Sequence, residues 1–235
     1  MTNQDQQEQS PNSPEDSNEE VSAAGEQKLI EDRLAKAAQL REKGIDPYPP
    51  RFDRTHNSVE ATKLFEYAEV MASNGVGDDA EHPRTETIRI AGRVMARRGM
   101  GKAAFIDLKD GYGSIQAFAR QNTMGDEAYE IVNLLDIGDI IGVEGSVIRT
   151  RRGEISVEAQ KVTVLTKAIR PLPDKWHGLQ DQEIRFRQRY LDLISNDNAM
   201  KNALLRSNVV KSMREYMHGA GFIEVETPIL VPVAG

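Results

Sequence analysis

The spacing of hydrophobic residues changes twice along this chain of 235 residues. Over residues 26–43, apolar side chains recur three and four positions apart, which predicts an amphipathic helix that ends at Gly44. A looser repeat of the same kind predicts a second, shorter helix over residues 59–72. From residue 86 to residue 167 the period falls to two, which is the pattern of half-buried β-strands. A helical period returns over residues 198–218.

The segment with a period of two divides into five predicted strands and one helix. The strands cover residues 87–97, 104–109, 114–120, 139–150 and 154–165, and the helix covers residues 126–135. The sequence Asp110-Gly111-Tyr112-Gly113 predicts a tight hairpin between the second and third strands. Other small β-barrels share part of this order, but a single helix between the third and fourth strands favours an OB-fold, a partly open five-stranded barrel. We therefore predict a mainly β fold with added α: a five-stranded OB-fold barrel behind N-terminal helices.

Alternation within these strands predicts which side chains face away from the barrel interior. Because neighbouring residues of a strand point to opposite faces, the inward Ile and Val residues fix the outward ones. The predicted outward residues are Phe105, Asp107, Gln116, Phe118, Arg120, Glu154, Ser156 and Glu158. An aromatic ring beside a glutamine, with Arg97 and Arg98 at the end of the first strand, can stack a base, read its edge and neutralise phosphate. The alternative is a ring that only covers the barrel and arginines that are only solvated; the OB topology favours the binding face.

The net charge of −7 comes from the N-terminal tail. Residues 1–27 hold seven acidic residues and no Lys or Arg, so the rest of the chain is neutral. This tail is also poor in apolar residues and predicts disorder, with a role as an acidic partner-binding arm as the less favoured alternative. The chain has no cysteine, which excludes disulfides and thiol catalysis, and its four histidines are too widely spaced to predict a metal site. No apolar run is long enough to cross a membrane, so we expect a cytoplasmic protein without a membrane partner.

The C-terminal segment combines a helix with a predicted strand. The helix over residues 198–218 carries a broad apolar stripe, which by itself indicates only a packed helix. It is followed by Gly-Phe-Ile-Glu-Val-Glu-Thr-Pro at residues 221–228, which predicts a strand that ends in a proline. Together they resemble motif 1 of class II aminoacyl-tRNA synthetases, which opens an α+β catalytic domain.

Two further stretches make the resemblance more specific. The sequence from Arg97 to Phe105, Arg-Arg-Gly-Met-Gly-Lys-Ala-Ala-Phe, resembles the start of the anticodon-binding domain of bacterial lysyl-tRNA synthetases. Residues 170–181 and 185–193 are similar to the interdomain linker of that family, whereas the linkers of aspartyl- and asparaginyl-tRNA synthetases differ. The resemblance covers the chain from about residue 29 to its last residue and implies an N-terminal fragment that ends just after motif 1.

The resemblance also implies a division into domains. We expect a disordered acidic tail (1–27), N-terminal helices and a loop (28–85), an OB-fold anticodon-binding domain (86–168), an interdomain linker (169–195) and the truncated start of a class II catalytic domain (196–235). By motif position, Phe105 stacks on an anticodon base, Gln116 reads or flanks it, and Arg98 and Glu154 add polar contacts. The implied partner is the anticodon loop of lysine tRNA, with a uridine-rich triplet.

The same resemblance implies a homodimer, with Phe222, Glu224 and Pro228 at its interface. The full-length parent enzyme activates lysine with ATP and Mg²⁺ and transfers it to its tRNA. Motifs 2 and 3, which carry that chemistry, do not occur in this sequence. We therefore expect no catalytic residue in this chain, no binding of ATP or Mg²⁺ by it and no activity of it alone. The alternative function is a non-catalytic OB-fold protein that binds single-stranded RNA, and a reading frame that continues past Gly235 would distinguish the two.

Overall fold

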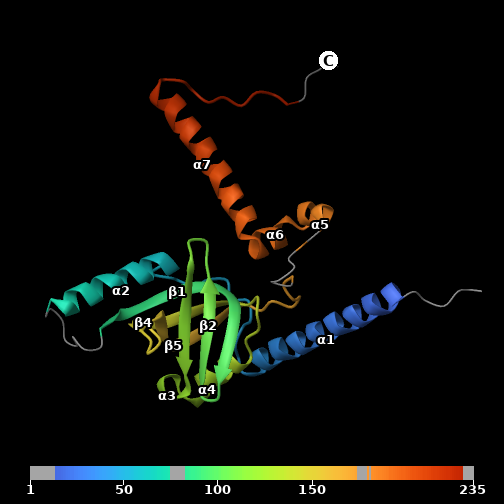
Figure 1. The fold of residues 1–235 in the computed structure, drawn as a ribbon, viewed down its shortest axis with the longest axis vertical. Helices are drawn as coiled ribbons and strands as arrows, with labels where there is room; N and C mark the ends of the chain where they lie inside the picture. The colour runs from blue at the N-terminus through green and yellow to red at the C-terminus, as the bar shows by residue number, and fades with distance from the viewer. Residues whose placement is uncertain (1–13, 75–82, 174–178, 180, 230–235) are drawn as a thin grey trace, which may run out of the picture. The chain divides into compact units, whose positions relative to one another are not determined.

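The computed structural model describes residues 14–74, 83–173, 179 and 181–229. The chain forms two compact units, Met1–Pro171 and Leu172–Gly235. In the first unit, helices α1 (Pro14–Glu42) and α2 (Ser58–Ser73) precede a five-stranded barrel, and in the second unit three helices follow one another. Figure 1 shows the order of these elements along the chain.

The barrel confirms the predicted OB-fold. Its strands are β1 (Arg84–Met100), β2 (Ala103–Lys109), β3 (Ser114–Arg120), β4 (Ile140–Arg149) and β5 (Ile155–Thr166). They close in the order β1-β2-β3-β5-β4, and only β3 and β5 pair in parallel. Parallel neighbours need a crossover, and the chain between β3 and β4 contains α3 (Gln121–Met124) and α4 (Asp126–Asn133). The barrel is thus closed rather than partly open, and its crossover is two short helices, joined at Gly125 with φ of 84°.

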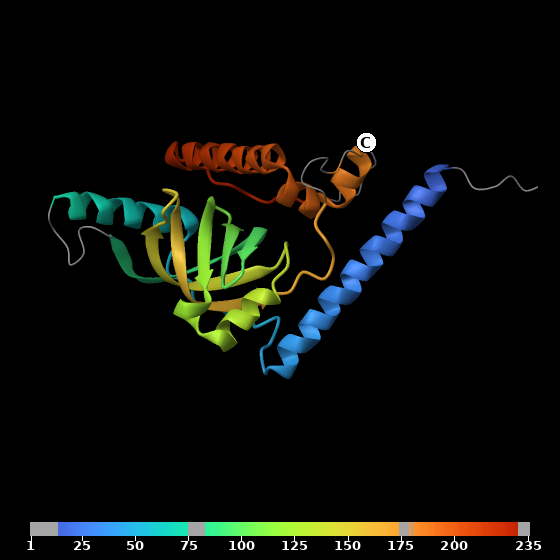
Figure 2. The same ribbon diagram turned by 60° about the horizontal axis from the view of Figure 1, so that its bottom comes forward.

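Helices cover the barrel on two sides. In Figures 1 and 2, α2 and the α3–α4 pair lie on opposite sides of the barrel. Phe65 of α2 and Val132 of α4 are fully buried in the same core as the inward residues of the strands. A capping box at Asn57 and Glu60 begins α2, since each side chain bonds to the other residue's backbone N–H. The paired strands β4 and β5 approach each other closely at Gly145, where an added Cβ atom would lie 2.0 Å from the carbonyl oxygen of Glu158.

Hydrogen bonds and ion pairs of two side chains hold helix α1 to the barrel. The Arg33 guanidinium donates to the carbonyl oxygens of Ile137, Ala168 and Arg170, at 3.1, 2.9 and 3.0 Å. Arg33 itself is only 8% exposed, and a buried charge needs such partners, so Arg33 fixes α1 against the loop before β4 and the end of the barrel.

A second contact of α1 uses a half-buried carboxylate. Lys36 lies 2.5 Å from Asp136, and the fully buried Lys167 pairs with both Asp136 and Asp139. Burial alone would raise the pKa of Asp136, but hydrogen bonds from Lys167 and Lys36 hold it below its ordinary value. The ionised carboxylate therefore stabilises the folded unit.

The start of α1 differs from the expectation of a disordered tail over residues 1–27. The helix begins at Pro14, and residues 1–13 lie outside the described part of the chain. A proline fits the first turn of a helix because its missing N–H has no partner there anyway. Low apolar content therefore did not prevent helix formation over residues 14–27.

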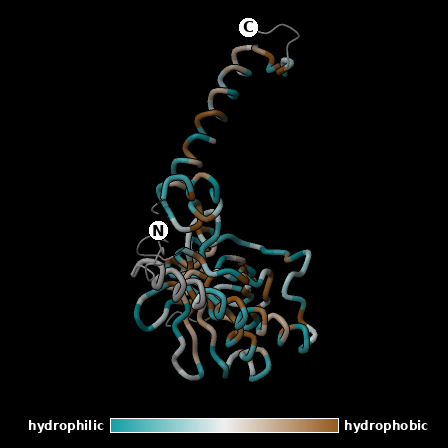
Figure 3. The backbone as a smooth tube through the Cα atoms, turned by 90° about the vertical axis from the view of Figure 1, so that its right-hand side faces the viewer, coloured by the Kyte–Doolittle hydropathy of each residue, from teal (hydrophilic) through white to brown (hydrophobic). Residues whose placement is uncertain are grey.

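The second unit consists of α5 (Gln182–Arg187), α6 (Arg189–Ser195) and α7 (Asp197–Gly219). Asp192 of α6 is 1% exposed and accepts hydrogen bonds from Arg185, at 2.9 Å, and from Arg189. These two arginines thus form internal ion pairs. Figure 3 shows hydrophobic and hydrophilic residues alternating along α7.

The predicted strand over residues 222–228 is wrong for the described part of the chain. These residues follow α7 as an irregular, exposed segment, and Ile223 is 84% exposed. A strand is stable only when its backbone N–H and C=O groups pair with a neighbouring strand, and the barrel strands are the only ones that the described residues form. Among the residues that the structure describes, no helix is both long and apolar enough to span a bilayer.

Candidate nucleic-acid interface

Two rows of side chains cross the outer face of the barrel. Pairing between strands places Arg98, Phe105, Phe118 and Glu158 in one row from β1 to β5. The next row holds Asp107, Gln116 and Ser156. Residues two apart on a strand share a face, so both rows belong to one surface, which we call the β2–β3 face.

Aromatic rings form the centre of the first row. The rings of Phe105 and Phe118 stack with centroids 4.5 Å apart and planes 7° apart. The Arg120 guanidinium lies 5.2 Å from the Phe118 centroid and is ion-paired with the buried Glu158. Phe118 therefore has partners on both sides, whereas Phe118 is the only ring partner of Phe105 among the described residues. Such a half-buried ring offers one face for stacking.

Polar side chains form a connected network beside the rings. Arg98 Nη2 donates to Asp107 Oδ1 at 2.8 Å. Gln116 Nε2 donates to Glu154 Oε2 at 3.0 Å and lies 3.4 Å from Asp107 Oδ1, while Ser156 Oγ donates to Gln116 Oε1 at 3.0 Å. Exposure differs sharply within the network: the Arg98 and Asp107 side chains are 60% and 34% exposed, but Gln116 is only 6% exposed.

The four residues expected to bind an anticodon, Arg98, Phe105, Gln116 and Glu154, are thus brought together on one face. Sequence reasoning placed Phe118 and Asp107 outward but did not include them in the site. The hairpin register was the signal that could have included them, because counting back from the turn pairs Phe118 with Phe105 and Asp107 with Gln116.

One expected position on this face is wrong, and two residues predicted to point outward are buried. Arg97 does not lie on the β2–β3 face: it alternates with Arg98 and donates to Asn133 Oδ1 of α4 at 3.1 Å. Ser156 and Glu158 point outward as predicted but are buried, at 0% and 8% exposure. Both contact side chains of the neighbouring strand β3: Ser156 donates to Gln116, and Glu158 pairs with Arg120.

The turn between β4 and β5 carries further cations. Arg151 and Arg152 are exposed there. Arg149 instead contacts a helix: its guanidinium donates two hydrogen bonds to the Glu69 carboxylate of α2, at 2.6 and 2.5 Å. The hydrogen bond from Arg149 lowers the pKa of Glu69. Arg149 thus joins α2 to the barrel, and Arg151 and Arg152 are the candidates for phosphate contact.

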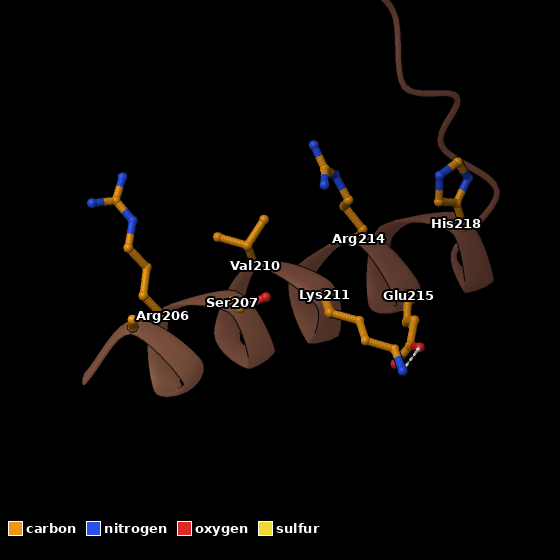
Figure 4. A pocket seen from close by; sticks show the side chains of 8 residues that line it. Arg206, Ser207, Val210, Lys211, Arg214, Glu215 and His218 are labelled. Atoms are coloured by element: carbon orange, nitrogen blue, oxygen red, sulfur yellow. Dashed lines mark ion pairs between the residues drawn. The ribbon is translucent and has the colours of Figure 1, made fainter. Parts of the chain in front are cut away.

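A second surface lies on α7. Figure 4 shows a hollow on this helix, lined by Ala203, Arg206, Ser207, Val210, Lys211, Arg214, Glu215 and His218. Glu224, expected at a dimer interface, accepts a hydrogen bond from Arg214 at 2.9 Å. Phe222 is 58% exposed, and Pro228 is also exposed. Exposed apolar residues run along the helix, including Leu205 and Met213, both 63% exposed.

Trp176 and His177 of the expected linker lie outside the described residues. Within the residues that the structure does describe, no three His, Cys, Asp or Glu side chains gather closely enough to hold a metal ion.

Comparisons with known proteins agree with both units. A family described as "OB-fold nucleic acid binding domain" matches residues 88–165. A family described as "tRNA synthetases class II (D, K and N)" matches residues 181–235.

Whole proteins are also similar to this chain. A lysine–tRNA ligase of Dehalococcoides mccartyi is 47% identical over 210 residues, which are 89% of this chain and 40% of that protein. Those of Carboxydothermus hydrogenoformans and Enterococcus faecalis are 46% and 47% identical over 88% and 86% of this chain. The chain spans about 40% of the length of the relatives that it matches.

Proposed function

Because this chain belongs to the lysine–tRNA ligase family, we propose that it acts as the anticodon-binding and dimer-forming part of such an enzyme. The whole enzyme activates lysine with ATP and transfers the lysyl group to lysine tRNA. In this part, the β2–β3 face binds the anticodon loop. The observation that carries the proposal is the stacked Phe105–Phe118 pair beside a network of charged and amide groups on an OB-fold face.

The chemistry of an anticodon loop suits this face. Its bases are unpaired and can be splayed out, so an aromatic ring can stack on one of them while side chains contact its edge. Phe105 provides the ring, and Arg98, Gln116 and Glu154 provide the polar contacts. Arg151 and Arg152 lie on an exposed turn and contact phosphates, whose binding is non-specific and salt-dependent.

The second unit supplies the dimer contact. An exposed apolar stripe on α7 and the exposed segment with Phe222, Glu224 and Pro228 support an isologous interface, in which the same surface of two copies meets. An uncovered apolar helix face favours such association.

ATP and Mg²⁺ belong to the chemistry of class II synthetases, in which positive groups and the metal stabilise charge on the phosphates. No cluster of metal-ligating side chains occurs within the described ranges of this chain. We therefore propose that the ATP and Mg²⁺ site of the whole enzyme is built from residues other than those described here. The proposed location is the cytoplasm, where tRNA is charged for protein synthesis.

Binding to a labelled RNA stem-loop with the anticodon UUU tests the proposal. We expect the 235-residue chain to bind this stem-loop more tightly than one with the same stem and an unrelated anticodon, at the same salt concentration. Equal affinity for both would mean that the face binds RNA only through its charge and would remove the anticodon assignment.

A further inference from the structure

Phe118 stands between Phe105 and Glu158 in the first row of the β2–β3 face. Its ring stacks on that of Phe105, with centroids 4.5 Å apart and planes 7° apart. The Arg120 guanidinium of the same strand lies 5.2 Å from the Phe118 centroid. Glu158, which is only 8% exposed, pairs with that guanidinium. Side chains of β2, β3 and β5 therefore fix the Phe118 ring.

Phe105 has fewer contacts that could fix its ring. Phe118 is its only ring partner among the described residues, and its neighbour in the row, Arg98, donates to Asp107 at 2.8 Å. A side chain that becomes ordered only when a ligand binds loses conformational freedom at that moment, which lowers affinity. The stack on Phe118 orders the Phe105 ring before a base arrives.

The contacts of Phe118 argue against direct stacking of a base on it. Phe105 and Arg120 already lie against its ring. To reach the ring, a base would have to displace the Arg120 guanidinium and take the closest cationic partner from the buried Glu158 carboxylate. Loss of a partner from a buried ion pair is strongly unfavourable. An effect of Phe118 on a bound base therefore passes through Phe105.

We propose that Phe118 is a positioning residue of the anticodon site, which holds the Phe105 ring in the orientation on which a base stacks. Arg120 and Glu158 hold Phe118 in turn. The inference rests on the proposed anticodon binding and adds to it the residue that orders the stacking ring in advance.

The first test compares two substitutions of Phe118. Phe118→Leu keeps an apolar side chain but has no flat ring, whereas Phe118→Tyr keeps the ring. Because the aromatic stack is lost, Phe118→Leu should bind the UUU stem-loop about 2- to 10-fold more weakly than the wild-type chain. Phe118→Tyr should bind it like the wild type. Circular dichroism checks that each variant is folded at the temperature of the binding measurement.

The second test places Phe118→Leu in the Phe105→Ala chain. A residue that acts only through Phe105 has no ring left to position there, so the added substitution should change the dissociation constant by less than about twofold. Residues that contact the RNA independently would instead add their effects. All variants are measured at one low salt concentration, at which the weakest of them still binds measurably.

Tyr112→Leu is the matched control. Tyr112 is also an aromatic residue with an arginine against its ring, since Arg54 lies 5.6 Å from its centroid. It lies in the β2–β3 turn, outside the two rows of the face. The same change from a ring to leucine should leave the dissociation constant there within about twofold.

Each result has a distinct meaning. Unchanged binding by folded Phe118→Leu would overturn the positioning role, and so would an equal loss in Phe118→Tyr or in Tyr112→Leu. Equal losses from Phe118→Leu with and without the Phe105 ring would show that Phe118 contacts the RNA itself, which also contradicts the inference. If the wild-type chain binds the UUU stem-loop and one with an unrelated anticodon equally well, the proposed anticodon binding is what fails.

Discussion

Phe105 offers the most direct test of the β2–β3 face. Its ring stacks on Phe118 at 4.5 Å, and Phe118 is in turn covered by Arg120, so one face of Phe105 is left for one base. Stacking of a base on an aromatic side chain contributes about 1–3 kcal/mol. Phe105→Ala should therefore weaken binding of the UUU stem-loop roughly 5- to 150-fold, since each 1.4 kcal/mol corresponds to about a factor of ten.

The same substitution has a separate effect on folding. The stacked pair contributes about 0.5–1.5 kcal/mol beyond the area that it buries. Phe105 is only half-buried, so the barrel should remain folded, with a lower melting temperature. Fluorescence anisotropy with a labelled stem-loop at fixed salt measures the affinity, and circular dichroism measures the melting.

Tyr112→Ala is the control for loss of an exposed ring. Tyr112 is 62% exposed and lies in the β2–β3 turn, outside the two rows of the face. It should leave the dissociation constant within about twofold, well below the change expected from loss of a stacked base. An unchanged dissociation constant for folded Phe105→Ala would refute the assignment of this face to base stacking.

Four further predictions concern stability, association and activity. Because hydrogen bonds lower the pKa of Asp136, its contribution to stability should be present above its ordinary value of about 3.9 and disappear as pH falls below it; urea unfolding between pH 5 and 2 should show this loss, and Asp136→Asn should flatten it. Gly145→Ala forces a Cβ against a backbone oxygen and should lower the free energy of unfolding by about 3 kcal/mol, while Gly99→Ala, which meets no atom within 4 Å, should cost far less. Light scattering should find dimers or larger oligomers for the full chain and a monomer for residues 1–173; monomers of both would exclude α7 as an interface. The purified chain should show no lysine-dependent exchange of pyrophosphate into ATP, and exchange above background would contradict this.

The sequence by itself determined the barrel and most of the β2–β3 face. Alternation along a strand indicates which side chains face the interior, and a four-residue turn sets the register of the hairpin, so the sequence alone predicted the outward direction of Phe105 and Gln116. The turn also determined that Phe118 and Asp107 stand opposite Phe105 and Gln116. These features are local, because each depends on residues close together in the chain.

Only the tertiary structure decided what covers these residues. Alternation placed Gln116 outward, but it is only 6% exposed and its amide contacts Asp107 of β2 and Glu154, which precedes β5. Likewise, Arg97 faces away from the β2–β3 face because α4 provides its partner, Asn133. Burial and hydrogen bonding depend on segments that lie far apart in the sequence, so the local spacing of hydrophobic residues does not reveal them. The same reason applies to residues 222–228: a β-prone pattern becomes a strand only when another strand supplies the matching backbone groups.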